Sequence, residues 1–371
     1  MDILIPVLLY AAAFVITYAQ SGKSVIDGYN GDRSGEYLAY LRMIDENRWV
    51  DDYLVNACLL STYIPSLVYR LVKRGRWVIF KASAPVFFSL MPVFTYLIAR
   101  QYFNVPASLI AAAFVLSNFY FLGDADTGRN GIACGVLSCS IWAFTGGHYL
   151  IFGISAVLVI ASHYATTFIY LFVLCMTLML SPARDIQPYI VTGIYGVLTL
   201  LWYGVFTRLR MLYFGVVDAT LKGKPSQGTT KEYGEYFSAQ KQILRAVTTV
   251  KKHVITKSRV LLVTTVLILV MILAGYILFY RYLSPATAAM ITSFLLVTAV
   301  SILSPAIGTA VGIYRVYFTG MPVIALLFAG CILRLSNWTG FTAYGVAAAV
   351  IIIYGLCNSG GMAYLLGEKS K

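Results

Sequence analysis

Nearly half of the acidic residues of this chain lie in one short segment between two apolar stretches. Two more, Asp124 and Asp126, lie between later apolar stretches. Because carboxylates serve as proton acceptors and as metal ligands, this distribution predicts a polar site at a membrane surface. Seven of the 15 Asp and Glu residues fall within 23–53, and they are Asp27, Asp32, Glu36, Asp45, Glu46, Asp51 and Asp52.

Two arginines and a histidine could hold an anion near these carboxylates. Arg315 stands in the apolar run 306–333, where one Arg costs about 2.5–3.5 kcal/mol at mid-helix, less near an end. A lipid phosphate or a loop carboxylate would offset that cost. Arg129 opens an expected helix, where the helix dipole disfavours a cation, so we expect an anion beside it. His163 could donate to a phosphate or could serve as a satisfied helix-end histidine.

Composition places the chain among helical membrane proteins. Hydrophobic residues make up 59% of it, charged residues 12%, and the mean hydropathy is +0.77, far more apolar than a soluble domain. The sequence has no Walker A loop, no dinucleotide glycine fingerprint and no zinc-spaced His and Cys residues. We therefore expect one integral domain over 1–371, with loops and helix ends supplying any chemistry.

Apolar runs predict about eleven transmembrane helices. A break is expected at 162–164, because the stretch 149–180 is too long for one span. The expected helices cover 3–19, 78–99, 105–122, 128–144, 150–162, 165–180, 189–206, 260–280, 286–303, 309–333 and 341–357.

Two long loops between these helices carry opposite charge. Within 23–53, four basic residues face seven acidic ones, and within 208–259 eleven basic residues face three. The first belongs to an acidic first external loop, 20–77, and the second to a basic amphipathic loop, 207–259. In the basic loop, 236–254 predicts an interfacial helix. Lys251 and Lys252 could contact a phosphate or anchor this helix to anionic headgroups, whereas nucleic acid is not expected as a partner.

The topology depends on the segment 54–72. It is apolar enough to span, yet five polar or Pro residues interrupt it, and a basic tail follows at 70–76. If it spans, Asp32 and Glu36 face the opposite side from Arg129. If it lies in the interface, these groups can form one site.

Several motifs, in order and spacing, resemble known membrane proteins. The run from Gly31 to Tyr37 is similar to the first external loop of GT-C class glycosyltransferases. Residues 27–335 resemble a family of uncharacterised archaeal multi-spanning proteins, with Asn130 where that family has Gln. The chain lacks the large extramembrane C-terminal domain of many GT-C enzymes, so the resemblance does not identify the acceptor. The motifs are Phe80-Lys81, Pro85, Phe88-Ser89-Leu90, Pro92, Tyr96, Arg100, Arg129-Asn130-Gly131-Ile132-Ala133, Ser162-His163-Tyr164 and Arg315-Val316-Tyr317.

The resemblance implies a GT-C-like fold with interfacial helices in the first external loop, which favours the interfacial alternative for 54–72. It also implies transfer of a sugar from a polyprenyl (dolichyl-type) phosphate carrier to an acceptor hydroxyl outside the cell membrane. Asp32 would be the base, with Glu36 orienting the acceptor or sharing a metal.

The other candidate residues would take part in the same transfer reaction. Arg129, His163, Arg315, Lys251 and Lys252 would hold the lipid phosphate. Asp124 and Asp126 could bind a divalent cation, Mg or Mn, although a polar helix cap explains them equally.

Two other functions remain open. One is a non-catalytic lipid-binding, flipping or scaffold subunit of a membrane complex that keeps this fold. The other is an intramembrane thiol peptidase, because Ala133-Cys134-Gly135 is similar to the Ala-Cys of archaeal sortase-like proteins.

Overall fold

The computed structural model describes residues 3–21, 31–46, 59–118, 128–183, 185–206, 259–303 and 313–358, and these residues are all helical or in turns. Every helix expected from the apolar runs is present. The elements are α1 (Leu4–Gln20), α3 (Gly31–Asp45), α5 (Tyr63–Val72), α6 (Arg76–Phe88), α7 (Leu90–Arg100), α8 (Val105–Leu116), α10 (Arg129–Thr145), α11 (Tyr149–Ser162), α12 (Tyr164–Leu180), α13 (Gln187–Leu200), the π-helix η1 (Leu201–Phe206), α16 (Arg259–Phe279), the 3-10 turn η2 (Tyr280–Tyr282), α17 (Pro285–Leu303), α19 (Ile313–Thr339) and α20 (Thr342–Asn358).

Only three described helices are long and apolar enough to cross a membrane. They are Arg76–Arg100, which joins α6 and α7, Val263–Tyr282 and Phe318–Thr339. Six further apolar helices have 10–17 residues in the part that the structure describes fully, whereas a span needs about 20. The expected count of about eleven spans is therefore not confirmed, although the helices themselves are.

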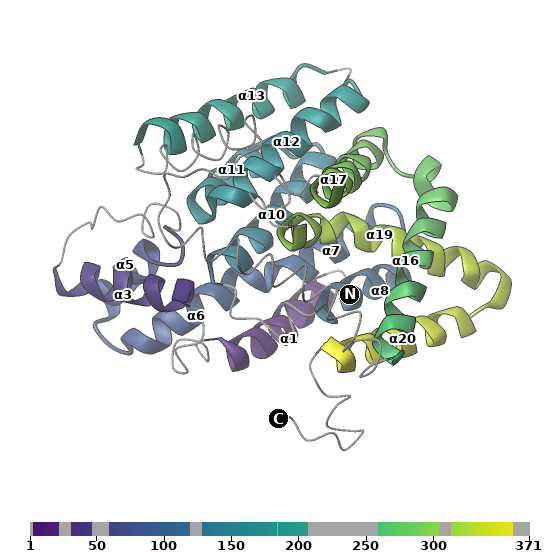
Figure 1. The fold of residues 1–371 in the computed structure, drawn as a ribbon, viewed down its shortest axis with the longest axis horizontal. Coiled ribbons are helices and arrows are strands. Elements are labelled where there is room, and N and C mark those ends of the chain that lie inside the picture. Colours follow the sequence, from purple (N-terminus) through teal and green to yellow (C-terminus); the bar gives the residue numbers. More distant parts are fainter. Residues whose placement is uncertain are drawn as a thin grey trace.

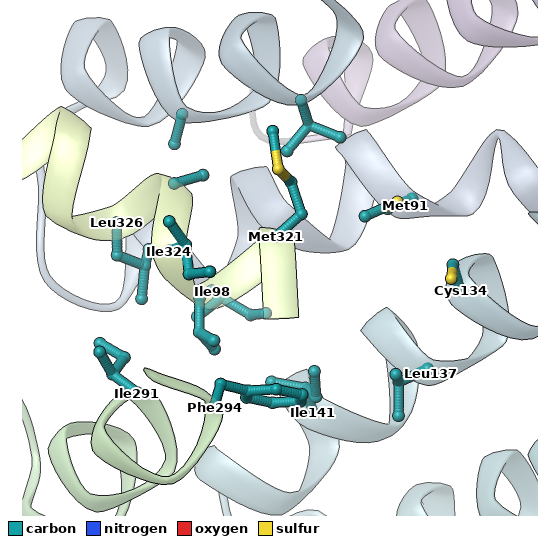
Figure 2. Close-up of a cluster of buried hydrophobic side chains, with 14 of the residues drawn as sticks. Met91, Ile98, Cys134, Leu137, Ile141, Ile291, Phe294, Met321, Ile324 and Leu326 are labelled. Carbon is teal, nitrogen blue, oxygen red and sulfur yellow. The ribbon is translucent and has the colours of Figure 1, made fainter. Parts of the chain in front are cut away.

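Helix α19 runs from the middle of the bundle towards one edge (Figure 1) and packs against α7, α8, α16, α17 and α20. In its membrane-length segment 83% of the residues are buried, against 28% in the segment built mainly from α16. Figure 2 shows Met321, Ile324 and Leu326 of α19 among side chains from α7, α10 and α17. The apolar core thus holds together helices that are far apart in the sequence.

Cys134 belongs to this same core. Its side chain is 1% exposed, and Figure 2 shows it at the edge of the cluster near Leu137. A thiol in such surroundings behaves as a small hydrophobic group rather than as a nucleophile. Its burial argues against the thiol peptidase alternative.

Two glycines allow helices to approach closely. A Cβ added at Gly275 of α16 would lie 1.8 Å from the carbonyl oxygen of Leu327 in α19. A Cβ added at Gly135 of α10 would lie 1.9 Å from the carbonyl oxygen of Phe87 in α6. Because backbone blocks each position, α16 and α10 can pack this closely only without a side chain there.

The described part of the doubtful segment 54–72 is a short helix. α5 has ten residues, about half of what a span requires. It lies beside α3 and α6 at one side of the molecule, away from α16 and α20 (Figure 1). Residues 54–58 lie outside the described part of the chain, and the interfacial alternative for 54–72 stays a prediction.

The break expected at 162–164 is confirmed. α11 ends at Ser162, α12 begins at Tyr164, and His163 between them has extended backbone angles. The side chain of His163 caps α12, because its Nδ1 lies 3.4 Å from the backbone N of Thr166, which donates to it. The histidine therefore supplies a cap that the first turn of a helix needs.

Gly275→Ala should destabilise the protein by about 1–3 kcal/mol, because the new methyl group would force α16 away from α19. Thermal unfolding in detergent measures the effect as a lowered Tm. Gly345→Ala in α20 is the matched control, since an added Cβ meets nothing within 4 Å there. Equal Tm values for the two variants would contradict the close approach.

Candidate functional site

Helix α3, which carries the early carboxylates, is held against α6 by aromatic side chains. Tyr37 makes ring contacts with Trp77 and Phe80, at centroid distances of 5.1 and 4.9 Å. Tyr40 also packs on Phe80 and donates its hydroxyl to the backbone oxygen of Arg76 at 2.8 Å. Desolvation raises the pKa of Tyr40, with the neighbouring Tyr37 adding to the effect. The phenol thus stays neutral and donates.

Glu36 extends from this helix to the first residue of α10. Its Oε1 lies 3.9 Å from Nε of Arg129 and accepts from the backbone N–H of Arg129 at 3.4 Å. The two side chains are 1% and 8% exposed. A carboxylate here stabilises the helix N-terminus and neutralises a cation that the dipole disfavours. The anion expected beside Arg129 is therefore Glu36.

The pairing brings the first loop to one end of the bundle. α10 runs parallel to α6 and α7, because Gly135 lies against Phe87 and Trp142 packs on Phe94 at 5.6 Å. The same residue offset between the two helices places Arg129 at the height of Lys81 along the helix axes. Lys81 itself lies over the ring of Tyr18, 4.6 Å from its centroid. We call this end of the bundle, around Glu36 and Arg129, the carboxylate end.

His163 lies at the carboxylate end as well. α11 runs antiparallel to α10, as the contact between Phe144 and Phe152 and the short turn between the helices require. By this pairing, His163 is level with Ala133, one helical turn from Arg129. His163 is buried, and its Nδ1 lies 2.9 Å from the hydroxyl of Thr166. This geometry fits the helix-end interpretation, with Nδ1 of His163 engaged in the cap of α12.

The start of α19 approaches the same end. Phe318 packs on Phe88 at 5.6 Å, and Phe88 in turn adjoins Gly135 of α10. α19 is antiparallel to α8, since Met321 contacts Asn118 and Phe328 stacks on Phe114. Its backbone at Arg315 thus lies one turn closer to the carboxylate end than Phe318.

For some candidate residues the position of the side chain is not described. Asp32 and Arg315 lie in helices α3 and α19, and only their backbones are described. Asp124, Asp126, Lys251 and Lys252 lie outside the described residues. Within the described ranges no three His, Cys, Asp or Glu side chains gather as metal ligands. The metal and lysine predictions accordingly stay predictions.

The structure adds residues that the charge pattern of the sequence did not identify. The aromatic platform of Tyr37, Tyr40, Trp77 and Phe80 fixes α3, and Lys81 joins the carboxylate end as a further cation. The sequence held one signal for them, the Phe80-Lys81 pair among the motifs of the resemblance. Asn130 is buried next to Arg129, and its Oδ1 has no hydrogen-bond partner among the described residues.

Comparison with known proteins identifies no relative. No family model matches the chain, and no curated protein matches it.

Breaking the buried pair should be costly. Glu36→Gln and Arg129→Gln should each destabilise the fold, by up to about 3–5 kcal/mol, because each removes one charge of a buried ion pair. The double variant should lose less than the sum, with a coupling of about 0.5–3 kcal/mol. Chemical unfolding in detergent measures the free energy of unfolding of the unsubstituted protein, the two single variants and the double variant.

Asp45→Asn serves as the control for removing a carboxylate from α3, because Asp45 is exposed at the end of this helix. It should change stability little. If the effects of Glu36→Gln and Arg129→Gln simply add, the two side chains do not form the interaction described above.

Proposed function

We propose that the chain is a GT-C-like glycosyltransferase of the cell membrane. It moves a sugar from a polyprenyl phosphate carrier to an acceptor hydroxyl at the carboxylate end of the bundle, on the outer side. The observation that supports the proposal is the contact between Glu36 and Arg129. This contact joins the acidic first loop to the helix ends that carry the candidate cations.

In this proposal the carboxylates have separate tasks. Asp32, four residues before Glu36 and so on the same face of α3, takes the proton from the acceptor hydroxyl. Glu36 is enclosed and paired with Arg129, so it serves as a positioning residue that fixes α3 at the reaction centre. General base catalysis of this kind contributes about 10²–10⁴-fold to a rate.

The transfer balances in one displacement. The acceptor oxygen forms a bond to the anomeric carbon as its proton passes to Asp32. The bond between that carbon and the phosphate oxygen breaks, and the electron pair leaves with the polyprenyl phosphate. The configuration of the sugar carbon is inverted. Cations placed at the departing phosphate lower the barrier, because they stabilise the charge that develops there.

Arg129, Arg315 and His163 are proposed to hold this phosphate, with Lys251 and Lys252 adding charge from the basic loop. Arg129 and His163 are buried. Their attraction to a phosphate would be strong there, because little water is present to screen it. Asp124 and Asp126 are the proposed ligands of a divalent cation, Mg or Mn, which would neutralise phosphate oxygens when bound.

The membrane setting rests on the apolar helices. Three described segments can cross a bilayer by length and composition, and several shorter apolar helices pack beside them (Figure 1). We propose that most of these shorter helices also cross, with the interfacial helix α5 on the outer face. The chain would then be a multi-pass protein of about eleven spans.

A second candidate is a non-catalytic lipid-binding, flipping or scaffold subunit of a membrane complex. The observation that favours it is that both Glu36 and His163, two of the proposed site residues, have structural partners within the fold. Under this candidate, Asp32 would have no catalytic task and the protein would bind polyprenyl phosphate without consuming it.

Asp32→Asn should lower sugar transfer by about 10²-fold or more, because the amide cannot accept the acceptor proton. Purified protein in vesicles is assayed with a radiolabelled polyprenyl phosphate sugar and an extract of cell-surface acceptors. Asp45→Asn, a change of the same kind at the exposed end of α3, should keep its activity. Unchanged turnover in Asp32→Asn would remove the base assignment, and donor binding without any transfer by the unmodified chain would favour the second candidate.

A further inference from the structure

Helix α5 has an exposed apolar face that none of the described residues covers. Ile64, Val68 and Leu71 are 38%, 40% and 85% exposed. Their spacing of four and three residues places them on one side of the helix. The opposite side, with Pro65 and Ser66, is buried. α5 is thus amphipathic, with its apolar stripe pointing away from the protein.

A group of cations follows the stripe directly. Lys73, Arg74 and Arg76 are exposed, and none of them forms an ion pair with a described residue. The described stretch 59–118, which contains α5 and these cations, has no Asp or Glu. Asp45 and Glu46 lie at the end of α3, the helix that packs against α5.

An apolar stripe beside exposed cations fits one kind of partner. The stripe can enter the boundary between headgroups and acyl chains, while Lys and Arg bind anionic headgroups. A protein surface would need its own acidic patch next to an apolar one, whereas an anionic bilayer supplies both as a continuous surface. The short length of α5 also suits a helix that lies on the bilayer.

Contacts inside the protein join α5 to the carboxylate end. Arg70 of α5 donates through Nη2 to the backbone oxygen of Met43 in α3 at 2.8 Å. Leu59 and Tyr63 pack against Ala39 and Met43 of the same helix. Since α3 also carries Glu36, a displacement of α5 would be transmitted through α3 to the contact between Glu36 and Arg129.

We infer that α5 and the cations that follow it bind the surface of an anionic membrane, and that this contact holds α3 in place at the carboxylate end. The inference requires that the protein lies in a membrane, but it does not require sugar transfer. Anionic lipid would then stabilise the arrangement of Glu36 and Arg129 whichever activity the protein has.

Hydrogen exchange of the full chain tests this inference. The protein is placed in nanodiscs of phosphatidylcholine, or of phosphatidylcholine mixed with phosphatidylglycerol, and backbone exchange is measured by mass spectrometry. Peptides from α5 and α3 should exchange more slowly when phosphatidylglycerol is present, whereas peptides from α8 should not change. The difference should shrink at high salt, because screening weakens the attraction.

Matched variants separate this surface from a general effect of charge. Lys73→Gln combined with Arg74→Gln should abolish the slower exchange. It should also weaken binding of a fluorescent phosphatidylglycerol by roughly fivefold for each cation removed. Arg281→Gln combined with Arg334→Gln removes two exposed cations at the C-terminal ends of α16 and α19, away from the carboxylate end, and should keep the response.

Three outcomes would overturn the inference. Exchange in α5 and α3 could be the same in both kinds of nanodisc, or the two double variants could behave alike. Protection of α5 seen only in native membranes, and in neither nanodisc, would assign its apolar face to a protein partner instead.

Discussion

The contact between Glu36 and Arg129 is the constraint on which the arrangement of this protein depends. It joins a helix from the first loop to the first residue of a helix in the bundle, and both side chains are almost fully buried. Buried ions need partners, since an isolated one is expensive to desolvate. Because of this contact, α3 has a defined position at one end of the bundle, and α5 is placed through its own contacts with α3.

Aromatic packing and close helix approach support that contact. Tyr37 and Tyr40 fix the face of α3 against α6, while Gly135 sets α10 directly against the backbone of Phe87. The parallel course of α6 and α10 then puts Lys81 and Arg129 at one level. Chemistry at this end therefore depends on residues whose own role is to hold two helices in register.

Charge and apolar patterning in the sequence predicted much of this arrangement. The helix positions, the break at His163 and an anion beside Arg129 all follow from span length and dipole arguments, and the structure confirms them. The pairing of Glu36 in particular, among seven acidic residues of one segment, could not be predicted. It depends on how Tyr37 and Tyr40 rotate α3 against α6, which is a matter of tertiary packing. Span count was less predictable still, because helix length depends on caps and turns that hydropathy does not register.

The two ends of the bundle should lie on opposite sides of the membrane. Arg74→Cys lies beyond the carboxylate end, in the exposed turn before α6, and His148→Cys lies in the exposed turn where α10 ends. In intact cells, a membrane-impermeant thiol reagent should label the first and not the second, with the unsubstituted chain giving the background from native cysteines. Labelling of both positions from the same side, or of position 148 alone, would contradict the account, because the first loop could not then meet Arg129 on the outer face.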